Sequence, residues 1–382
     1  MVGANVQQGQ LVRVSADIVH AELVRAVADA AYRHGASFVE ADLSDVLLQR
    51  AQVMHARGEV RGTLPAWWES GLRELAEAGG ARIMIHAPTA PGLFDELDPA
   101  RVLRAQPPRS RVWRAVEYLV NNTVVPGPNQ AWADSLHPGL EPPDALNRLW
   151  EQIKVACRLD QPDPVAAWRE RFADLRRRAQ ALTALDLDEV RFAGPGTDLR
   201  IGLLPTARWE PPTNVNVHGI EHAWNLPSEE VYTVPDPNRV DGHVRLTRPA
   251  VAAGRLIPGV SLRFEAGRLV DVAGADGVDM LSELIARDPG MSRLGELALV
   301  DGDSAVGSVC QTFGMILLDE NTAAHIALGF GFPELVDPAE RDRVNQSGDH
   351  LDVSIGSEEV SVTGYDRAGR EQPLLHAGRW QF

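Results

Sequence analysis

The chain has 382 residues, of which 44% are hydrophobic and 24% charged, a composition that can bury large cores. Lys and Arg total 37 against 53 Asp and Glu, so the net charge of −16 disfavours a nucleic-acid partner, whose phosphates it would repel. Two cysteines, Cys157 and Cys310, exclude a disulfide framework and a thiolate zinc site. Any metal site must therefore use His, Asp and Glu side chains.

Length and hydropathy set further limits. A chain of this length favours two domains over one. No uninterrupted apolar run of about 18 residues occurs, so we expect no membrane span. The N-terminal residues, MVGANVQQGQ, contain neither a basic segment nor an apolar one. We therefore expect no secretory signal and a cytoplasmic location.

Strand and helix patterns alternate through the N-terminal third. Apolar residues recur at helical spacing from Leu23 to Ala31, and Gly35 is a typical helix stop. Strands that alternate with helices over short turns indicate a parallel sheet with helices on its faces. No GxGxxG or phosphate loop occurs here, so no nucleotide site is predicted. The predicted elements are strands at 11–17, 36–43 and 81–87 and helices at 18–35, 44–58 and 67–80.

The sequence pattern changes after a long predicted helix at Asp163–Leu185. Before it, residues 120–144 are rich in Pro and Asn, and we predict irregular structure there. After it come short strand patterns separated by Gly, Asp and Pro. We therefore predict an N-terminal α/β domain at 1–185, built on an open and mostly parallel sheet. A C-terminal α+β domain at 186–382 would carry a metal site.

His350 and Asp352 stand two residues apart in a predicted strand, DHLDVSIGS. Residues i and i+2 of a strand point to the same face, so the imidazole and the carboxylate project side by side. Such a pair can bind a metal ion, form a hydrogen-bonded pair or be solvated. The spacing alone leaves all three interpretations open.

Further candidate ligands lie upstream of this pair. Glu229 and Glu230 fall in a turn that leads into a strand, and Glu230 could equally be a solvated turn residue. Glu296 lies in an apolar strand, where an ionised carboxylate is costly to bury unless it is paired or bound to metal. His325 is on an apolar helix-like stretch and could be an ordinary core histidine.

Four separate blocks of the chain resemble those of the M29 family of metallo-aminopeptidases. The similarity also covers the N-terminal GQLVRVSA segment and RFAGPGTDLRIGL, so it extends over most of the chain in the family's order. A match in four separated blocks is far more specific than one short motif. The blocks are NLPSEEVYTVPD, LGELALVD, DENTAAHIALG and NQSGDHLDVSIGS.

The resemblance implies a site with two divalent ions, zinc or cobalt, that hydrolyses an N-terminal peptide or amide bond. Glu230 rather than Glu229 matches the family's first ligand because it directly precedes the Val-aromatic pair; we expect the Glu229 side chain to point away. The family also implies a homodimer whose active sites face an enclosed space and admit small peptides. The implied metal ligands are Glu230, Glu296, His325, His350 and Asp352.

The chain departs from the family at three positions near the implied ligands. Phe332 occupies the position of a family tyrosine, and Gly314 and Met315 occupy those of a Tyr-Asn pair. The catalytic residue therefore stays unassigned. Either these changes are neutral, or the pocket has been retuned for a specialised substrate.

Two other classes stay open at this point. His325, His350 and Asp352 together form a two-His-one-carboxylate set, which suits a mononuclear Fe(II) oxygenase. A ring-cleaving dihydroxypyridine dioxygenase resembles this same scaffold. Against that interpretation, Glu230 and Glu296 are both present, and a mononuclear iron site does not need them. The third class is a catalytically silent metal-binding protein.

Overall fold

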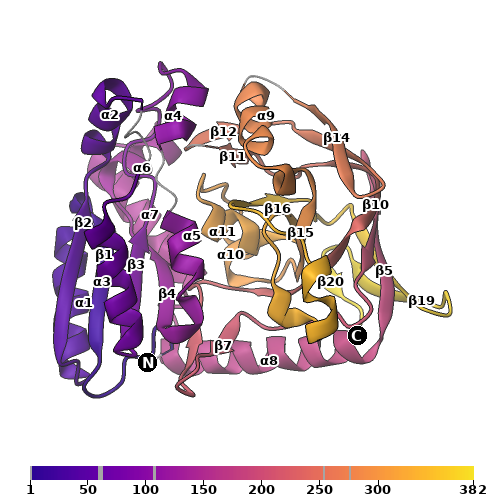
Figure 1. Cartoon of the computed structure of the whole chain (residues 1–382), viewed down its shortest axis with the longest axis horizontal. Helices are drawn as coiled ribbons and strands as arrows, with labels where there is room; N and C mark the ends of the chain where they lie inside the picture. Colours follow the sequence, from indigo (N-terminus) through magenta and orange to yellow (C-terminus); the bar gives the residue numbers. More distant parts are fainter. Residues whose placement is uncertain (1, 59–62, 106–108, 253, 275–276) are drawn as a thin grey trace. The chain divides into compact units, whose positions relative to one another are not determined.

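The computed structural model divides the chain into two compact units (Figure 1). It describes all residues except 1, 59–62, 106–108, 253 and 275–276. These units are defined by compactness and alternate along the sequence. The predicted boundary between two domains at residue 185 stays a prediction. Unit 1 comprises Met1–Arg169 and Thr213–Ser228, and unit 2 comprises Glu170–Pro212 and Glu229–Phe382.

A four-stranded parallel sheet with strand order β2-β1-β3-β4 is the framework of unit 1. Buried and half-buried residues alternate along β1, and Val12 and Val14 pack with Val24 of α1 in one core cluster. The predicted parallel sheet with helices is confirmed. The strands are β1 (Leu11–Asp17), β2 (Phe38–Ser44), β3 (Ala81–His86) and β4 (Asn121–Pro126), with a separate hairpin of β7 (Thr213–Val215) and β8 (Glu221–Ala223).

The first three helices of unit 1 lie close to their predicted positions, and the other four were not predicted. The first of them ends at Arg33, and Gly35 follows it with φ at 96°, in the left-handed region that favours glycine. No helix in the described part of the chain has the length and apolar character needed to cross a membrane. The helices are α1 (Ala21–Arg33), α2 (Val46–His55), α3 (Ala66–Glu77), α4 (Pro99–Ala105), α5 (Arg109–Arg114), α6 (Gln130–Leu136) and α7 (Pro142–Ala156).

The prediction of irregular structure at 120–144 is wrong, since this segment forms β4, α6 and the start of α7. Asn121 is fully buried in β4, where its side chain accepts a hydrogen bond of 2.8 Å from Gln10 Nε2. Pro142 occupies the first turn of α7, where a missing N–H costs nothing. Asn and Pro are turn signals in a sequence, but here tertiary hydrogen bonds and a helix start account for them.

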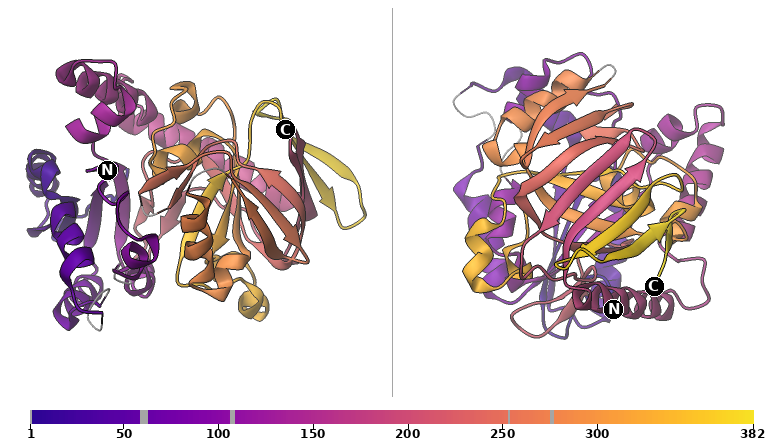
Figure 2. Two further views of the ribbon diagram at one scale, coloured as in Figure 1. Left: turned by 90° about the horizontal axis from the view of Figure 1, so that it is seen from above. Right: turned by 90° about the vertical axis from the view of Figure 1, so that its right-hand side faces the viewer.

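A large antiparallel sheet dominates unit 2 and is seen face-on in the right-hand view of Figure 2. Its eight strands follow the order β14-β13-β10-β6-β5-β18-β19-β20. Helix α8 (Pro164–Ala184), which begins in unit 1, confirms the predicted helix at 163–185. The strands are β5 (Leu187–Gly194), β6 (Thr197–Leu203), β10 (Pro235–Arg245), β13 (Ser261–Glu265), β14 (Arg268–Ala273), β18 (Ser361–Asp366), β19 (Glu371–His376) and β20 (Arg379–Trp380).

A second antiparallel sheet of unit 2, with order β17-β16-β15-β9, carries the predicted ligands. Every residue of β15 and β16 is buried. His325 is the first residue of β16, so the predicted helix at this point is wrong. A short, wholly buried apolar run has no period that separates a strand from a helix. The strands are β9 (Glu230–Thr233), β15 (Leu294–Val300), β16 (His325–Gly329) and β17 (His350–Ser354).

Unit 2 also contains a short hairpin and three short α-helices among its described residues. They are the hairpin of β11 (Ala250–Ala252) and β12 (Arg255–Ile257), and the helices α9 (Val278–Ala286), α10 (Ala305–Ser308) and α11 (Ile316–Asp319).

A β-bulge sets the position of Glu296 in β15. The pairing with β16 shifts between Leu294 and Glu296, so Gly295 is the extra residue. A Cβ atom on Gly295 would lie 2.2 Å from the carbonyl oxygen of Phe330. Only glycine therefore permits this close approach of the two strands next to Glu296.

We expect Gly295→Ala to destabilise unit 2 by about 1–3 kcal/mol, because the added methyl group forces β15 away from β16. Thermal unfolding of the variant measures this. Gly139→Ala is the matched control, since a Cβ atom there meets nothing within 4 Å. Equal unfolding temperatures for the two variants would contradict the role given to the bulge.

Candidate metal centre

Strand register brings the predicted ligands to one face of the smaller sheet. Residues paired across strands share a face, as do residues two apart along a strand. Tyr232 of β9 pairs with Ala298 of β15, and Ala298 pairs with His325 of β16. Two residues further along β16, Ala327 pairs with Asp352. The face therefore carries Glu230, Glu296, His325, His350 and Asp352.

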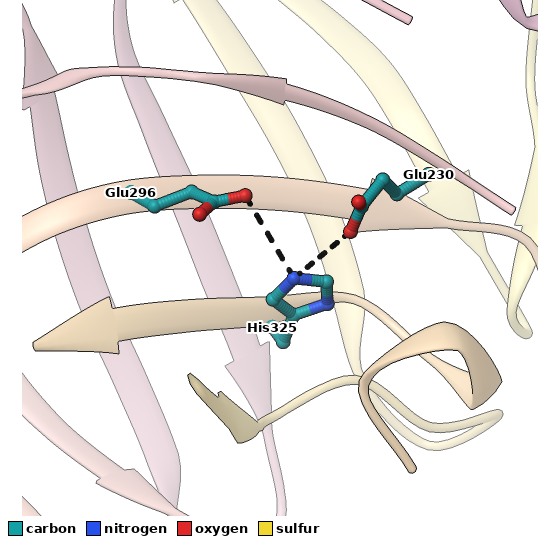
Figure 3. Close-up of side chains that lie close together, drawn as sticks. All are labelled: Glu230, Glu296 and His325. Carbon is teal, nitrogen blue, oxygen red and sulfur yellow. Dashed lines mark ion pairs between the residues drawn. The ribbon is translucent and has the colours of Figure 1, made fainter. Parts of the chain in front are cut away.

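The first group of ligand atoms joins three strands (Figure 3). His325 Nε2 lies 3.1 Å from Glu230 Oε2 and 3.9 Å from Glu296 Oε1. All three side chains point toward one another in the close-up, and all three residues are buried, with exposures of 1%, 8% and 5%.

The second group shares Glu296 with the first. His350 Nε2 lies 3.1 Å from Glu296 Oε2 and 3.1 Å from Asp352 Oδ1. Within each group, one ligand atom from each residue lies within 4.8 Å of the others. One oxygen of Glu296 thus faces His325 and the other faces His350, so the two groups meet at a single carboxylate.

The electrostatics of this face are governed by buried carboxylates. Burial raises the pKa of Glu296 above its ordinary value. Burial alone would lower the pKa of His325, but the hydrogen bond and charge of Glu230 outweigh it and raise that pKa to about 10. Burial also lowers the pKa of His350, but the charge and hydrogen bond of Asp352 outweigh it, so this pKa is raised well above its ordinary value. Bound protons, or cations in their place, therefore compensate the acidic face.

Sequence reasoning did not single out Glu320, which lies outside the four strands in the short helix Glu320–Thr322 but within electrostatic reach of the candidate ligands. The residue is buried, and burial followed by the charges of Asp352 and Glu230 raises its pKa well above the ordinary value. The carboxylate of its neighbour Asp319 instead accepts hydrogen bonds from the backbone N–H groups of Phe313 and Met315. Asp319 and Glu320 are adjacent in the sequence, and nothing in their spacing shows that their surroundings differ.

Glu230, which could have been a solvated turn residue, is buried. Its neighbour Glu229 belongs to neither group of candidate ligands. It is wholly buried, and its Oε2 lies 2.6 Å from Arg171 Nε. A charge in such a pair has been removed from water, so its partner cannot be deleted without cost. The sequence contains no local signal for this pair because its members are 58 positions apart.

The three departures from the family pattern occupy different surroundings. The Phe332 ring lies 5.8 Å from the ring of His350 and 5.2 Å from that of Tyr232, so it stands beside a predicted ligand. Met315 is buried and its N–H bonds to Asp319, and a Cβ atom on Gly314 would meet Leu256 at 3.4 Å. Phe332 is therefore the departure with a direct contact to the ligand set.

One structural likeness bears on the dioxygenase alternative. The 2,5-dihydroxypyridine dioxygenase of Pseudomonas putida KT2440 is similar to this chain with a TM-score of 0.51 and 13% identity, covering 99% of this chain and 93% of that one. At this identity the likeness concerns the fold alone.

Closer similarities identify the family. A model of the family described as thermophilic metalloprotease (M29) matches residues 1–380. Aminopeptidase T of Thermus aquaticus is 36% identical over 390 residues, covering 99% of this chain and 95% of the relative. The structure of wild-type AmpT from Thermus thermophilus matches with a TM-score of 0.90 and 35% identity, covering 100% of this chain and 96% of that one. The chain therefore belongs to the thermophilic metalloprotease (M29) family.

Proposed function

We propose that the chain hydrolyses the bond after the N-terminal residue of a small peptide or amide, with two divalent metal ions as cofactors. The observation that carries this proposal is the shared carboxylate of Glu296, whose oxygens lie 3.9 Å from His325 Nε2 and 3.1 Å from His350 Nε2. A carboxylate between two groups of ligands is suited to bridge a pair of metal ions.

Family membership supports the reaction class. The family is one of metalloproteases, and the relative described above is an aminopeptidase. The chain is accordingly a metallo-aminopeptidase-like hydrolase that depends on divalent metal. Zinc or cobalt as the metal, two as the number of ions, a homodimer and a cytoplasmic location are parts of our proposal, and they rest on the family resemblance.

The donor set fits ions of this kind. Imidazole nitrogen and carboxylate oxygen are ordinary ligands of zinc, and each group offers three protein ligands, which leaves a position for water or substrate. Two buried carboxylates, Glu230 and Glu296, and the half-buried Asp352 would be stabilised by a divalent cation, because an unpaired buried charge is costly. The proposed ligands are Glu230, Glu296, His325, His350 and Asp352.

A metal pair in this position would polarise the scissile carbonyl and lower the pKa of a bound water. Burial holds the pKa of the Glu320 carboxyl well above its ordinary value, so this group keeps a proton more readily than a free carboxylate does. We propose that it accepts and returns a proton during the reaction. Asn321 Nδ2 donates to Glu320 Oε1 over 3.3 Å and orients that group.

The grouping of the histidines argues against the mononuclear iron alternative. A facial triad needs His325, His350 and Asp352 around one ion. In the described residues, His325 instead groups with Glu230 and Glu296, whereas His350 groups with Asp352 and Glu296. The dioxygenase likeness adds no chemistry, because it concerns the fold alone.

The metal content of the purified protein tests the cofactor. After reconstitution with zinc or cobalt and removal of loose ions, elemental analysis should find close to two ions per chain. An amine-blocked peptide should resist hydrolysis, while the same peptide with a free amine is cleaved. A single bound iron together with oxygen consumption would contradict the hydrolase proposal.

Glu230→Gln should remove one ion and lower kcat/KM by more than about 100-fold, the upper range for residues that only support a ligand. The amide lacks the charge that offsets the cation. Metal titration and peptide hydrolysis measure both effects. Glu358→Gln, at an exposed position in the same unit, is the control. Full metal content in Glu230→Gln would show that this residue is not a ligand.

Phe332→Tyr tests whether the missing hydroxyl limits the reaction. Removal of one oxyanion-hole donor typically lowers kcat by about 10²–10³-fold. If the tyrosine hydroxyl is such a donor, restoring it should raise kcat on aminoacyl anilides while KM changes little. The assay compares the variant with the parent protein at equal metal loading. No gain on any short peptide or anilide would mean that Phe332 does not stand in for a catalytic group.

A further inference from the structure

A buried ion pair lies directly behind the proposed ligand Glu230. Arg171 of α8 places Nε 2.6 Å from Glu229 Oε2, with 13% and 0% of the two side chains exposed. The same guanidinium lies 3.4 Å from Asp301 Oδ2. Asp301 also accepts a hydrogen bond of 2.8 Å from Trp380 Nε1. One cation thus holds two buried carboxylates in the interior of unit 2.

The backbone of Glu229 is held as firmly as its side chain. Its N–H donates to Asn321 Oδ1 over 2.6 Å, and its carbonyl oxygen accepts from Arg171 Nη2 over 3.4 Å. Its Oε1 accepts a hydrogen bond from the Ala305 N–H. Asn321, itself wholly buried, is the residue that also donates to Glu320. The peptide groups on both sides of Glu229 therefore have fixed directions.

These contacts determine where Glu230 can point. The carbonyl that Arg171 contacts belongs to the peptide bond between Glu229 and Glu230. Glu230 pairs with Val300 across β9 and β15, and Asp301 follows Val300 in the chain. Arg171 therefore fastens the start of β9 to the end of β15, the two strands that carry Glu230 and Glu296.

We propose that Arg171 and Glu229 are positioning residues that aim the Glu230 carboxylate at its metal ion. The inference rests on the proposed ligand role of Glu230. Neither residue belongs to a group of candidate ligands, and both would act through the strand that follows. Partners that support a metal ligand in this way typically contribute about 10–100-fold to metal affinity.

The effect should be confined to one of the two ions. The group of Glu296, His350 and Asp352 takes two of its members from β17, and its third member, Glu296, pairs with Ala327 of β16 next to the bulge at Gly295, away from the end of β15 that Arg171 holds. Loss of the ion pair should therefore lower the affinity for the metal ion at Glu230 and His325, and leave the affinity for the other ion unchanged.

The test is a cobalt titration of the full-length, metal-free chain, followed by its visible absorption spectrum. The parent protein should bind two Co²⁺ ions. In Arg171→Met and in Glu229→Gln, we expect the affinity for one ion to fall by about 10–100-fold while the other is unchanged. Arg171→Lys should recover part of the loss, since it keeps the charge but not the forked contact.

Leu182→Ala is the control for a merely structural role. Leu182 lies on the same helix, is wholly buried and is apolar, so the variant should lower the unfolding temperature and still bind two ions. Two ions at parental affinity in Arg171→Met and Glu229→Gln would overturn the inference, as would an equal loss in Leu182→Ala. Failure of the parent protein to bind cobalt would instead contradict the proposed function. If Arg171→Met does not fold, Glu229→Gln and Arg171→Lys decide the question.

Discussion

Buried negative charge on one sheet face is the constraint on which the site depends. Glu230, Glu296 and Asp352 stand on three of the four strands of a sheet whose two central strands are wholly buried. Carboxylates removed from water need positive charge at close range. The two imidazoles provide part of that charge through raised pKa values, and divalent cations would provide it more completely.

Two features of unit 2 hold the strands of this face in position. The bulge at Gly295 lets two strands approach closely where Glu296 departs from the regular ladder. Behind β9, Arg171 and Glu229 hold the backbone that precedes Glu230. These features lie outside the proposed ligand set, yet they hold the backbone from which the proposed ligands extend. A preorganised site needs such support, since a small displacement of a ligand lowers metal affinity.

The sequence predicted those parts that depend on local pattern. Alternation of strands and helices gave the parallel sheet, and the stop at Gly35 has the positive φ that glycine favours. The pattern failed where tertiary contacts decide the structure. Asn121 looked like a turn residue but is paired with Gln10 in a buried strand, and His325 begins a strand too apolar to show a period.

The same division applies to the site. The i, i+2 spacing of His350 and Asp352 placed them on one face, as the register of β17 confirms. Glu320 and the Arg171–Glu229 pair could not be found in this way, because only the folded chain brings distant segments together. Family resemblance selected Glu230 over Glu229, a choice that composition and spacing leave open.

The bridging position of Glu296 is the central claim, and one measurement tests it most directly. Crystals of the zinc-loaded protein should be measured at wavelengths above and below the zinc absorption edge. The account predicts two anomalous peaks, one on each side of the Glu296 carboxylate, the first beside His325 and the second beside His350. A single peak shared by both histidines, with Glu230 and Glu296 turned away, would contradict it.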